Sequence, residues 1–138
     1  LKSRGIAPGI YIFPKMGGDW THGAPLPGGE IPGADYETFA NSLRDVYPWM
    51  PRKLVQHYGR LSGARTKDVA GAATSLAGLG RHFGGNLYEA EARYLVAKEW
   101  AQTAEDVLWR RTKHRLHLTE VERQAFTDWF ASDLAKAA

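Results

Sequence analysis

The stretch 87-LYEAEARYLVAKEWAQTAEDVLWRRTK-113 decides the fold of this chain, because its apolar residues recur at the three- and four-residue spacing of amphipathic helices. It predicts one helix over about 87–101 and a second over about 104–113. Thr103 is the expected N-cap of the second helix, and Asp106, three residues later, completes a box-like N-terminus. No convincing run of alternating apolar and polar residues, and no Asn-Gly turn, indicates a hairpin. The predicted fold class is therefore all-α.

Helix start and stop signals extend this pattern in both directions. Asp35 is an expected N-cap, and Thr119 with Glu122 forms an expected capping box. Proline and glycine punctuate the remaining segments, and 78–85 is expected to be a turn region. The sequence thus predicts a compact bundle of about five to six short helices, with the further helices at about 35–47, 51–63, 66–73 (capped by Thr66) and 119–135.

Residues 1–34 have a different composition from the rest of the chain. They hold five of the seven prolines and eight of the fifteen glycines, so a regular helix is excluded there. We expect a Pro/Gly-rich extended segment over 1–34, either a linker or a segment draped over the helices. One helical domain is expected to follow over 35–138.

Composition excludes several classes of protein. The chain has 138 residues and no cysteine, so disulfides and thiolate metal sites are impossible, which is compatible with a reducing cytoplasm. The net charge of +3 is too small and too dispersed to indicate nucleic-acid binding by itself. No apolar run approaches the ~20 residues of a membrane span, and no signal-peptide pattern is present.

The adjacent arginines Arg110 and Arg111 point in different directions, because neighbouring residues on a helix lie about 100° apart. Arg110 falls outside the apolar stripe, one turn after Asp106, so the two are expected to form a surface i, i+4 ion pair. Arg111 falls roughly 40° from Val107, inside the apolar stripe. A guanidinium there needs a carboxylate and further acceptors, because its desolvation is otherwise unfavourable.

Glu99 is the expected partner of Arg111, because on a wheel of the preceding helix it falls among apolar residues. The sequence therefore predicts a structural ion pair between Glu99 and Arg111, with Glu91 as the reserve partner. The alternative is that Arg111 packs its stem and extends its guanidinium to the rim. Trp109 points away from this core, and is the candidate interface residue. It is either half-covered locally or in contact with another domain or subunit.

A glycine pair could indicate a dinucleotide-binding turn. Gly78 and Gly80 begin such a pattern, but Phe83 stands in the place of the third glycine. The fingerprint also requires a preceding strand, whereas the upstream segment is alanine-rich helix. A plain turn is the favoured interpretation, so no cofactor-binding residue is expected.

The run 110-RRTKHRLH-117 raises two further possibilities. His114 and His117 lie three residues apart and could ligate a metal from one helix face, but Lys113 and Arg115 beside them would repel a dication. Solvated histidines at a helix end are favoured, so no metal ligand is expected. The run could also be a phosphate-binding patch, although basic residues are typical of any helix C-terminus.

The sequence resembles a known family across most of its length. The elements that carry the resemblance are the YEAE segment, the Glu-Trp-Ala of 99–101, the EDVLWRRT helix and the closing TEVERQAFTDWF, with 25-PLPGG-29 and 47-YPWMPRKLVQHYG-59 upstream. In order and spacing they resemble the C-terminal helical domain of aerobic, FAD-dependent, quinone-linked glycerol-3-phosphate dehydrogenase. The resemblance covers about Gly18 to Phe130 and does not include residues 1–16.

The resemblance implies a parent enzyme that oxidises sn-glycerol 3-phosphate to dihydroxyacetone phosphate, with hydride transfer to FAD and electrons passed to quinone. The chain would then be a structural and interaction domain without catalytic residues or FAD, and inactive alone. Its expected partners are the FAD-binding catalytic domain and, in a homodimer, a second copy, and not nucleic acid. The expected location is cytoplasmic, with the parent at the cytoplasmic face of the inner membrane. The alternative is an independent helical module that binds nucleic acid or anionic lipid through 110–117.

Overall fold

The structure is a computed structural model that describes residues 23–24, 26–31 and 35–134. Helical segments, five of them α-helices, make up most of it, which confirms the predicted all-α class. Shorter segments with 3₁₀ or π winding join or extend them, among which η6 and η8 are π-helical. The helices are α1 (Tyr36–Val46), α2 (Arg52–Ser62), α3 (Thr66–Ala70), α4 (Glu89–Glu99) and α5 (Glu120–Trp129), and the shorter helical segments are η4 (Gly63–Arg65), η5 (Leu76–Leu79), η6 (Asp106–Arg111), η7 (His114–Leu116) and η8 (Phe130–Leu134).

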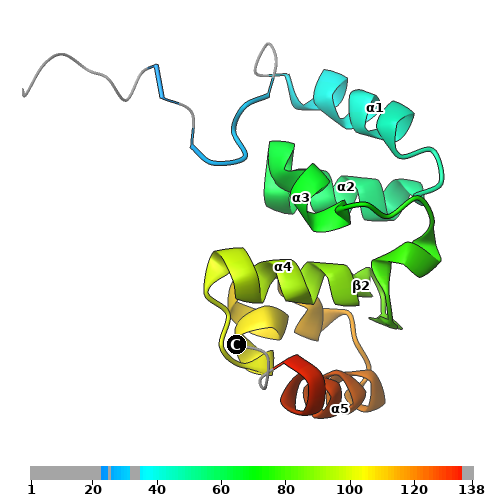
Figure 1. The fold of residues 1–138 in the computed structure, drawn as a ribbon, viewed down its shortest axis with the longest axis vertical. Coiled ribbons are helices and arrows are strands. Elements are labelled where there is room, and N and C mark those ends of the chain that lie inside the picture. Colours follow the sequence, from blue (N-terminus) through cyan, green and yellow to red (C-terminus); the bar gives the residue numbers. More distant parts are fainter. Residues whose placement is uncertain (1–22, 25, 32–34, 135–138) are drawn as a thin grey trace, which may run out of the picture.

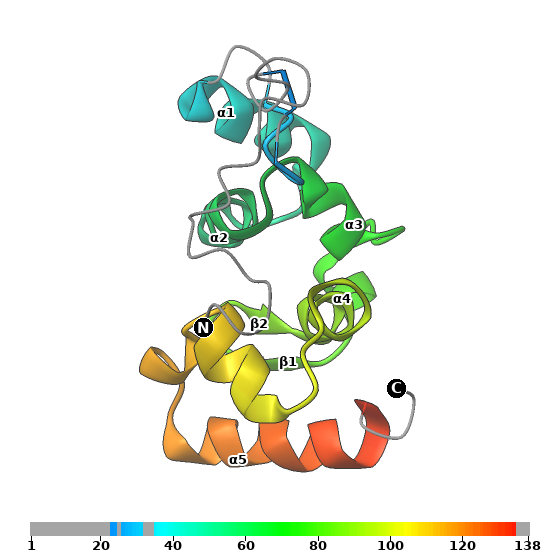
Figure 2. The ribbon, with the colours of Figure 1, turned by 90° about the vertical axis from the view of Figure 1, so that its left-hand side faces the viewer.

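The helices are stacked in layers along the long axis of the molecule. Figure 1 shows α1 at one end, then α2 and α3, then α4, and finally α5 at the other end. Seen from the side, α5 runs across the base, with η6 between it and α4 (Figure 2). Successive elements pack on each other, α1 on α2, α2 on α3, α3 on α4, and α4 on η6. Sequence neighbours are therefore mostly neighbours in space.

The predicted helix starts are largely confirmed. The side chain of Asp35 accepts hydrogen bonds from the backbone N–H groups of Glu37 and Thr38, at 3.1 and 3.2 Å. Thr119 and Glu122 form the predicted capping box at α5. Thr66 does not act as a cap, because it lies inside the first turn of α3 and its hydroxyl donates to the carbonyl of Gly63.

The expected turn region differs most from the prediction. Two short strands, β1 (His82–Gly84) and β2 (Leu87–Tyr88), form an antiparallel hairpin there. A three-residue strand is too short to show a period-2 pattern in sequence. Two predicted bounds also change, because α3 ends at Ala70 and α4 begins only at Glu89.

Gly84 lets this hairpin approach α5 closely. Its φ is +122°, and a Cβ at this position would lie 2.4 Å from Oε1 of Glu122 and 2.8 Å from Leu118. The close approach brings Phe83 of β1 onto the apolar face of α5. Its ring centroid lies 5.0 Å from that of Phe126 and 4.8 Å from that of Trp129, and aromatic clusters of this kind bury large apolar areas.

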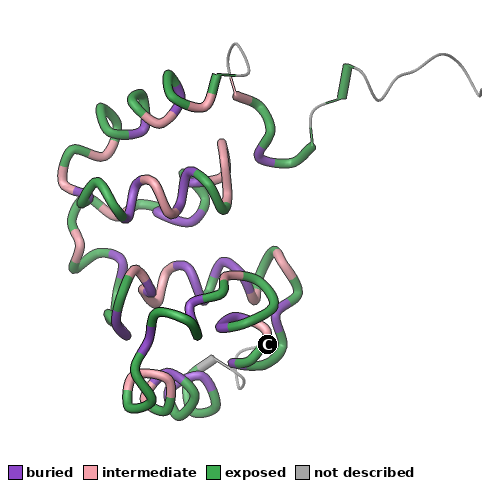
Figure 3. Tube along the Cα trace, turned by 180° about the vertical axis from the view of Figure 1, so that it is seen from behind, coloured by how far each residue is buried: buried purple, intermediate pink, exposed green. Residues whose placement is uncertain are grey.

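Buried residues alternate with exposed ones along each helix, as expected for amphipathic helices around a shared core (Figure 3). The core runs through all layers and contains Leu54, Val55 and Tyr58 of α2, Leu95 of α4, Val107 of η6 and Phe126 of α5. Trp100, where α4 ends, is a large apolar residue that lies outside this core. Its φ is +55° and its side chain is 83 % exposed.

The described part of the Pro/Gly-rich segment is attached to the helices. Gly28 is buried, and its carbonyl accepts a 2.9 Å hydrogen bond from the backbone N–H of Ala64. Ile31 packs against the core. Within 26–31 the chain is therefore draped on the end of α2, whereas residues 1–22 lie outside the described part of the structure.

Among the described residues, no helix combines the length and the apolar character that crossing a membrane requires.

Candidate functional site: a buried His-Glu-His cluster

Three ionisable side chains from separate elements meet in the interior. Nε2 of His57, on α2, lies 2.7 Å from Oε1 of Glu91, on α4. Nε2 of His114, on η7, lies 3.0 Å from the other oxygen, Oε2. Glu91 is 1 % exposed and His114 is 3 % exposed, whereas His57 is partly exposed. We call these three residues the His-Glu-His cluster.

Local structure turns His114 inward. The π-helix η6 ends at Arg111, and Lys113 adopts a left-handed conformation, with φ +67°. The hydroxyl of Thr112 donates to the carbonyl of Val107 and accepts from the backbone N–H of His114. These two bonds fix the turn, so that the imidazole of His114 points back into the core instead of continuing along the helix surface.

The cluster holds a buried negative charge. Burial alone would raise the pKa of Glu91, but the hydrogen bonds from His114 and His57 outweigh it and hold the pKa below its ordinary value. The ionised carboxylate can only accept, so both imidazoles donate from Nε2. An unpaired buried carboxylate would be very unfavourable, and the two histidines remove that penalty.

A fourth polar group adjoins the cluster. The side chain of Tyr58 is fully buried, and among the described residues its hydroxyl has no hydrogen-bond partner. Burial raises the pKa of Tyr58, and the charge of Glu91 raises it further. The rings of His57 and Tyr58 have centroids 5.5 Å apart.

The cluster reaches the surface only at His57. This residue lines an open pocket of about 400 Å³ together with Lys53, Gln56, Arg60, Leu61, Asn86 and Thr112. An organic substrate cannot contact both histidines and the carboxylate in this arrangement, because Glu91 and His114 are closed off. Two imidazoles and one carboxylate are, however, a metal-ligand set, and their ligating atoms all lie within 4.8 Å of one another.

The predicted ion pair between Glu99 and Arg111 is wrong. Arg111 is exposed, and Glu99 lies 3.9 Å from Arg65 of η4 instead. The error has a physical cause: η6 is wound as a π-helix with i→i+5 hydrogen bonding, so a wheel with 100° per residue misplaces its last residue. Glu91, the reserve partner, binds the two histidines.

The structure brings Asp106 and Arg110 together, with 3.1 Å between Oδ1 and Nη1. Asp106 also accepts from the backbone N–H groups of Gln102 and Thr103, and the hydroxyl of Thr103 accepts from the N–H of Asp106, as the box-like start predicted. His117 is exposed, as expected, but His114 is buried, and the interpretation of both as solvated histidines is wrong for His114.

Trp109, the candidate interface residue, lies at the surface with 39 % of its side chain exposed. Nζ of Lys113 lies 4.4 Å from the centre of its ring, and the guanidinium carbon of Arg115 lies 5.9 Å away. Both positions are typical of cation–π contacts, so the ring is partly covered from within the chain.

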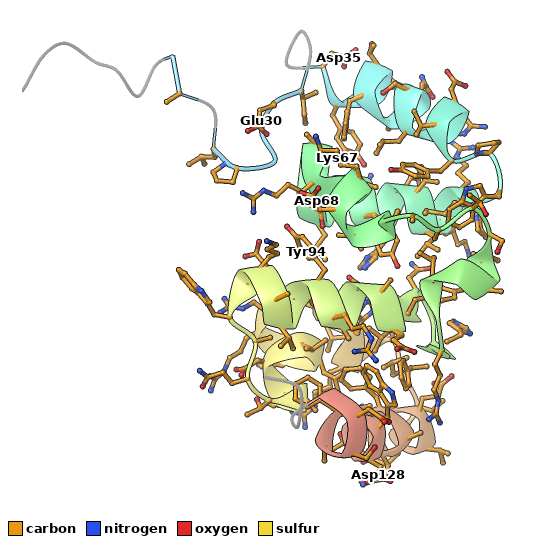
Figure 4. The ribbon with its side chains drawn as sticks, viewed as in Figure 1. Glu30, Asp35, Lys67, Asp68, Tyr94 and Asp128 are labelled. Atoms are coloured by element: carbon orange, nitrogen blue, oxygen red, sulfur yellow. The ribbon has the colours of Figure 1, made fainter. Side chains whose placement is uncertain are left out.

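Glu99 belongs to a second, half-exposed polar group between α3 and α4. The hydroxyl of Tyr94 lies 3.5 Å from Oε1 of Glu99, near the limit for a hydrogen bond. Figure 4 shows Tyr94 between α4 and α3, on the side where Lys67 and Asp68 lie. The ion pair between Glu99 and Arg65 contributes little to stability, since exposed ion pairs are worth about 0–1 kcal/mol.

The sequence did not predict the His-Glu-His cluster, because His57 and His114 lie 34 and 23 residues from Glu91. The one signal available was the position of Glu91 within the apolar face of its helix. A carboxylate there requires buried partners, and histidines are candidates as well as arginines.

The sequence matches the family described as the C-terminal domain of alpha-glycerophosphate oxidase, over residues 20–129. The chain belongs to this family. The resemblance inferred from the sequence is thus confirmed as a relation to the C-terminal domain of glycerol-phosphate dehydrogenases and oxidases.

Similar proteins fall into two groups by name. The chain is 72 % identical to D-erythritol 1-phosphate dehydrogenase of Brucella abortus (strain 2308) over 130 residues, which is 94 % of this chain. It is 40 % identical to aerobic glycerol-3-phosphate dehydrogenase of Escherichia coli (strain K12) over 85 % of the chain, and 38 % identical to glycerol-3-phosphate dehydrogenase of Pseudomonas aeruginosa (strain PAO1) over 88 %. The matched region spans 26, 23 and 24 % of these relatives, respectively, or about a quarter of each.

Proposed function

We propose that this chain is the C-terminal structural domain of an FAD-dependent dehydrogenase that oxidises D-erythritol 1-phosphate. The observation that carries the proposal is the 72 % identity to a D-erythritol 1-phosphate dehydrogenase, against 40 % to the glycerol-3-phosphate enzyme of Escherichia coli. The substrate expected from the sequence was sn-glycerol 3-phosphate, which becomes the second candidate here.

A structural role agrees with the placement of the polar side chains. In the described part of the chain, the convergent histidines and carboxylate are buried between helices and leave no room for a polyol phosphate at Glu91 or His114. FAD, which would accept the hydride, and the residues that contact substrate would then belong to a preceding domain. The domain described here would support that body, and Trp109 is the residue we assign to a contact with it or with a second copy.

Two further features of the whole protein are part of the proposal. Electrons would pass from FAD to membrane quinone at the cytoplasmic face of the inner membrane, with peripheral attachment. Both follow from the relation to aerobic glycerol-3-phosphate dehydrogenase, and they apply to the full-length protein.

The substrate is tested on the full-length protein that carries this domain. Purified flavoprotein would be given D-erythritol 1-phosphate and sn-glycerol 3-phosphate in parallel, with reduction of an artificial electron acceptor as the readout. We expect a kcat/KM at least about tenfold higher for the erythritol phosphate, which corresponds to about 1.4 kcal/mol of transition-state preference. Equal values, or a preference for glycerol 3-phosphate, would contradict the substrate assignment.

The structural role is tested separately on the 138-residue chain. It should neither retain FAD, judged by visible absorbance after gel filtration, nor reduce the acceptor with either substrate. Turnover by this chain with added FAD would overturn the structural assignment.

A binding module for nucleic acid or anionic lipid remains the alternative function. The ion pairs weigh against it, because Arg110 binds Asp106, Arg115 binds Glu105 at 3.0 Å, and His114 is buried. This leaves Arg111, Lys113 and the exposed His117 of the basic run 110–117 to contact an anionic partner. Of these, Lys113 lies over the ring of Trp109. Binding to DNA or anionic vesicles that weakens steeply with salt concentration would support this alternative.

A further inference from the structure

We propose that His57, Glu91 and His114 form a binding site for one divalent transition-metal ion, with zinc as the best-suited metal. The proposal is independent of the proposed function, because it concerns a site inside this domain and not the substrate of the whole protein.

The ligating atoms already converge. Nε2 of His57 and Nε2 of His114 lie 2.7 and 3.0 Å from different oxygens of the Glu91 carboxylate. The two imidazole rings have centroids 4.7 Å apart. Zinc binds histidine nitrogen and carboxylate oxygen at about 2.0–2.2 Å, so an ion placed between the three side chains would need only small side-chain rotations.

The ligand types also fit. Two histidines and one glutamate are an established zinc-binding set, and imidazole suits zinc, nickel and copper better than magnesium or calcium. Binding requires both imidazoles to be neutral and to present the lone pair of Nε2. Each ring would therefore carry its proton on Nδ1, and the ion would replace the two hydrogen bonds to Glu91.

The hydroxyl of Tyr58 provides a second, independent indication. It is fully buried and lacks a partner among the described residues, and the centroid of its ring lies 5.5 Å from that of His57. Buried polar groups without a hydrogen-bond partner are rare, and a bound water or ion is one way to satisfy them. With three protein ligands, zinc keeps a fourth position for water, and that water would be a hydrogen-bond partner for the hydroxyl.

An ion would approach the site from the pocket at His57, the one cluster residue that lines it. The charged residues that line this pocket are Lys53 and Arg60, both cationic. They oppose the entry of a free dication, and they favour a water or an anion over a further cation at the open coordination position. The site should therefore bind zinc more weakly than a closed four-ligand structural site.

Metal binding would join three parts of the fold. His57, Glu91 and His114 belong to α2, α4 and η7, which are separate elements of the fold. An ion held by all three would add free energy to the folded state alone, because the ligands are far apart in the unfolded chain.

The test uses the 138-residue chain after treatment with a chelator. Isothermal titration with Zn²⁺, at a pH above the ordinary histidine pKa of about 6.5, should show one ion per chain, and Zn²⁺ should raise the melting temperature. Co²⁺ should bind at the same site and give the visible absorption of a four-coordinate nitrogen and oxygen complex. The variants His57→Gln and His114→Gln should each weaken Zn²⁺ binding by more than about tenfold.

The matched control is His117→Gln, which changes an exposed histidine of the same turn and should bind Zn²⁺ as the unmodified chain does. His57→Gln is the decisive variant, because His57 is at the rim and its replacement is the least disruptive to folding. Circular dichroism establishes that it is folded. Absence of Zn²⁺ binding to the unmodified chain, or unchanged binding by folded His57→Gln, would overturn the proposal.

Discussion

Oε2 of Glu91 lies 3.0 Å from Nε2 of His114, and both side chains are almost entirely removed from solvent. The bond joins α4 to η7, the short helical segment that follows η6, and so links two separate elements. A buried charge of this kind stabilises a fold only while its partners are present, because each charged group has lost its hydration.

Replacing Glu91 by Ala should strongly destabilise the metal-free chain. We expect a loss of about 2–4 kcal/mol in the free energy of unfolding, since both histidines lose their acceptor and a cavity is left. Urea denaturation in the presence of a chelator measures it. Glu105→Ala, which removes an exposed pair with Arg115, is the control and should cost less than about 1 kcal/mol. Equal losses for the two variants would show that the cluster does not stabilise the fold.

Replacing Arg111 by Met should leave the stability nearly unchanged. Arg111 is exposed and Glu99 lies beside Arg65, so we expect a change within about 0.5 kcal/mol. Thermal denaturation is the measurement. Val107→Ala, at a fully buried position of the same helix, should cost about 2 kcal/mol. A comparable loss of stability for Arg111→Met would contradict this expectation and support the buried ion pair that the sequence predicted.

Replacing Gly84 by Ala should cost more than the same change at Gly71. Both have positive φ, but a Cβ at Gly71 meets nothing within 4 Å, whereas at Gly84 it would collide with Glu122 and Leu118. Backbone strain alone predicts about 1–2 kcal/mol for Gly71→Ala, and Gly84→Ala should exceed this by at least ~1 kcal/mol. Urea denaturation of both variants gives the difference. If the two losses were equal, the close approach of the hairpin to α5 would not matter for stability.

Asp106 should make the stability fall in acid. The backbone N–H of Gln102, then Thr103 and Arg110, hold the pKa of Asp106 below its ordinary value. Its contribution is therefore complete above the unfolded-state pKa of about 3.9, and is lost as the pH falls through the lower folded-state pKa. Carboxylate chemical shifts followed by NMR across this range give the folded value. Asp106→Asn should be less stable at neutral pH and should lose less stability on acidification, and an Asp106 that titrates at its ordinary pKa would contradict this.

The helices could be predicted from sequence because their signals are local. Asp35, Thr119 and Glu122 act within one turn of their own position, so their hydrogen bonds follow from spacing alone. The hairpin at His82–Gly84 gave no such signal, because it is held by contacts with α5 that are more than thirty residues away.

The candidate site was less accessible to this reasoning. The pair of Asp106 and Arg110 lies within one turn and was expected, but the partner of Glu91 depended on how three distant elements pack. Two local features also made the side-chain directions predicted by the helical wheel incorrect. The π winding of η6 places Arg111 at the surface, and the left-handed conformation of Lys113 turns His114 inward. Neither feature has a reliable sequence signature.

The bond between Gly28 and Ala64 has a consequence for cooperativity. It joins the chain ahead of α1 to the chain after α2, so residues 28–64 form a loop closed without a covalent link. A closed loop of this kind should open as one unit, and the amides of α1 and α2 should exchange with solvent at similar rates. Residues 28–31, part of the segment that composition assigns to a linker or a draped segment, then belong to the same folding unit as the first two helices.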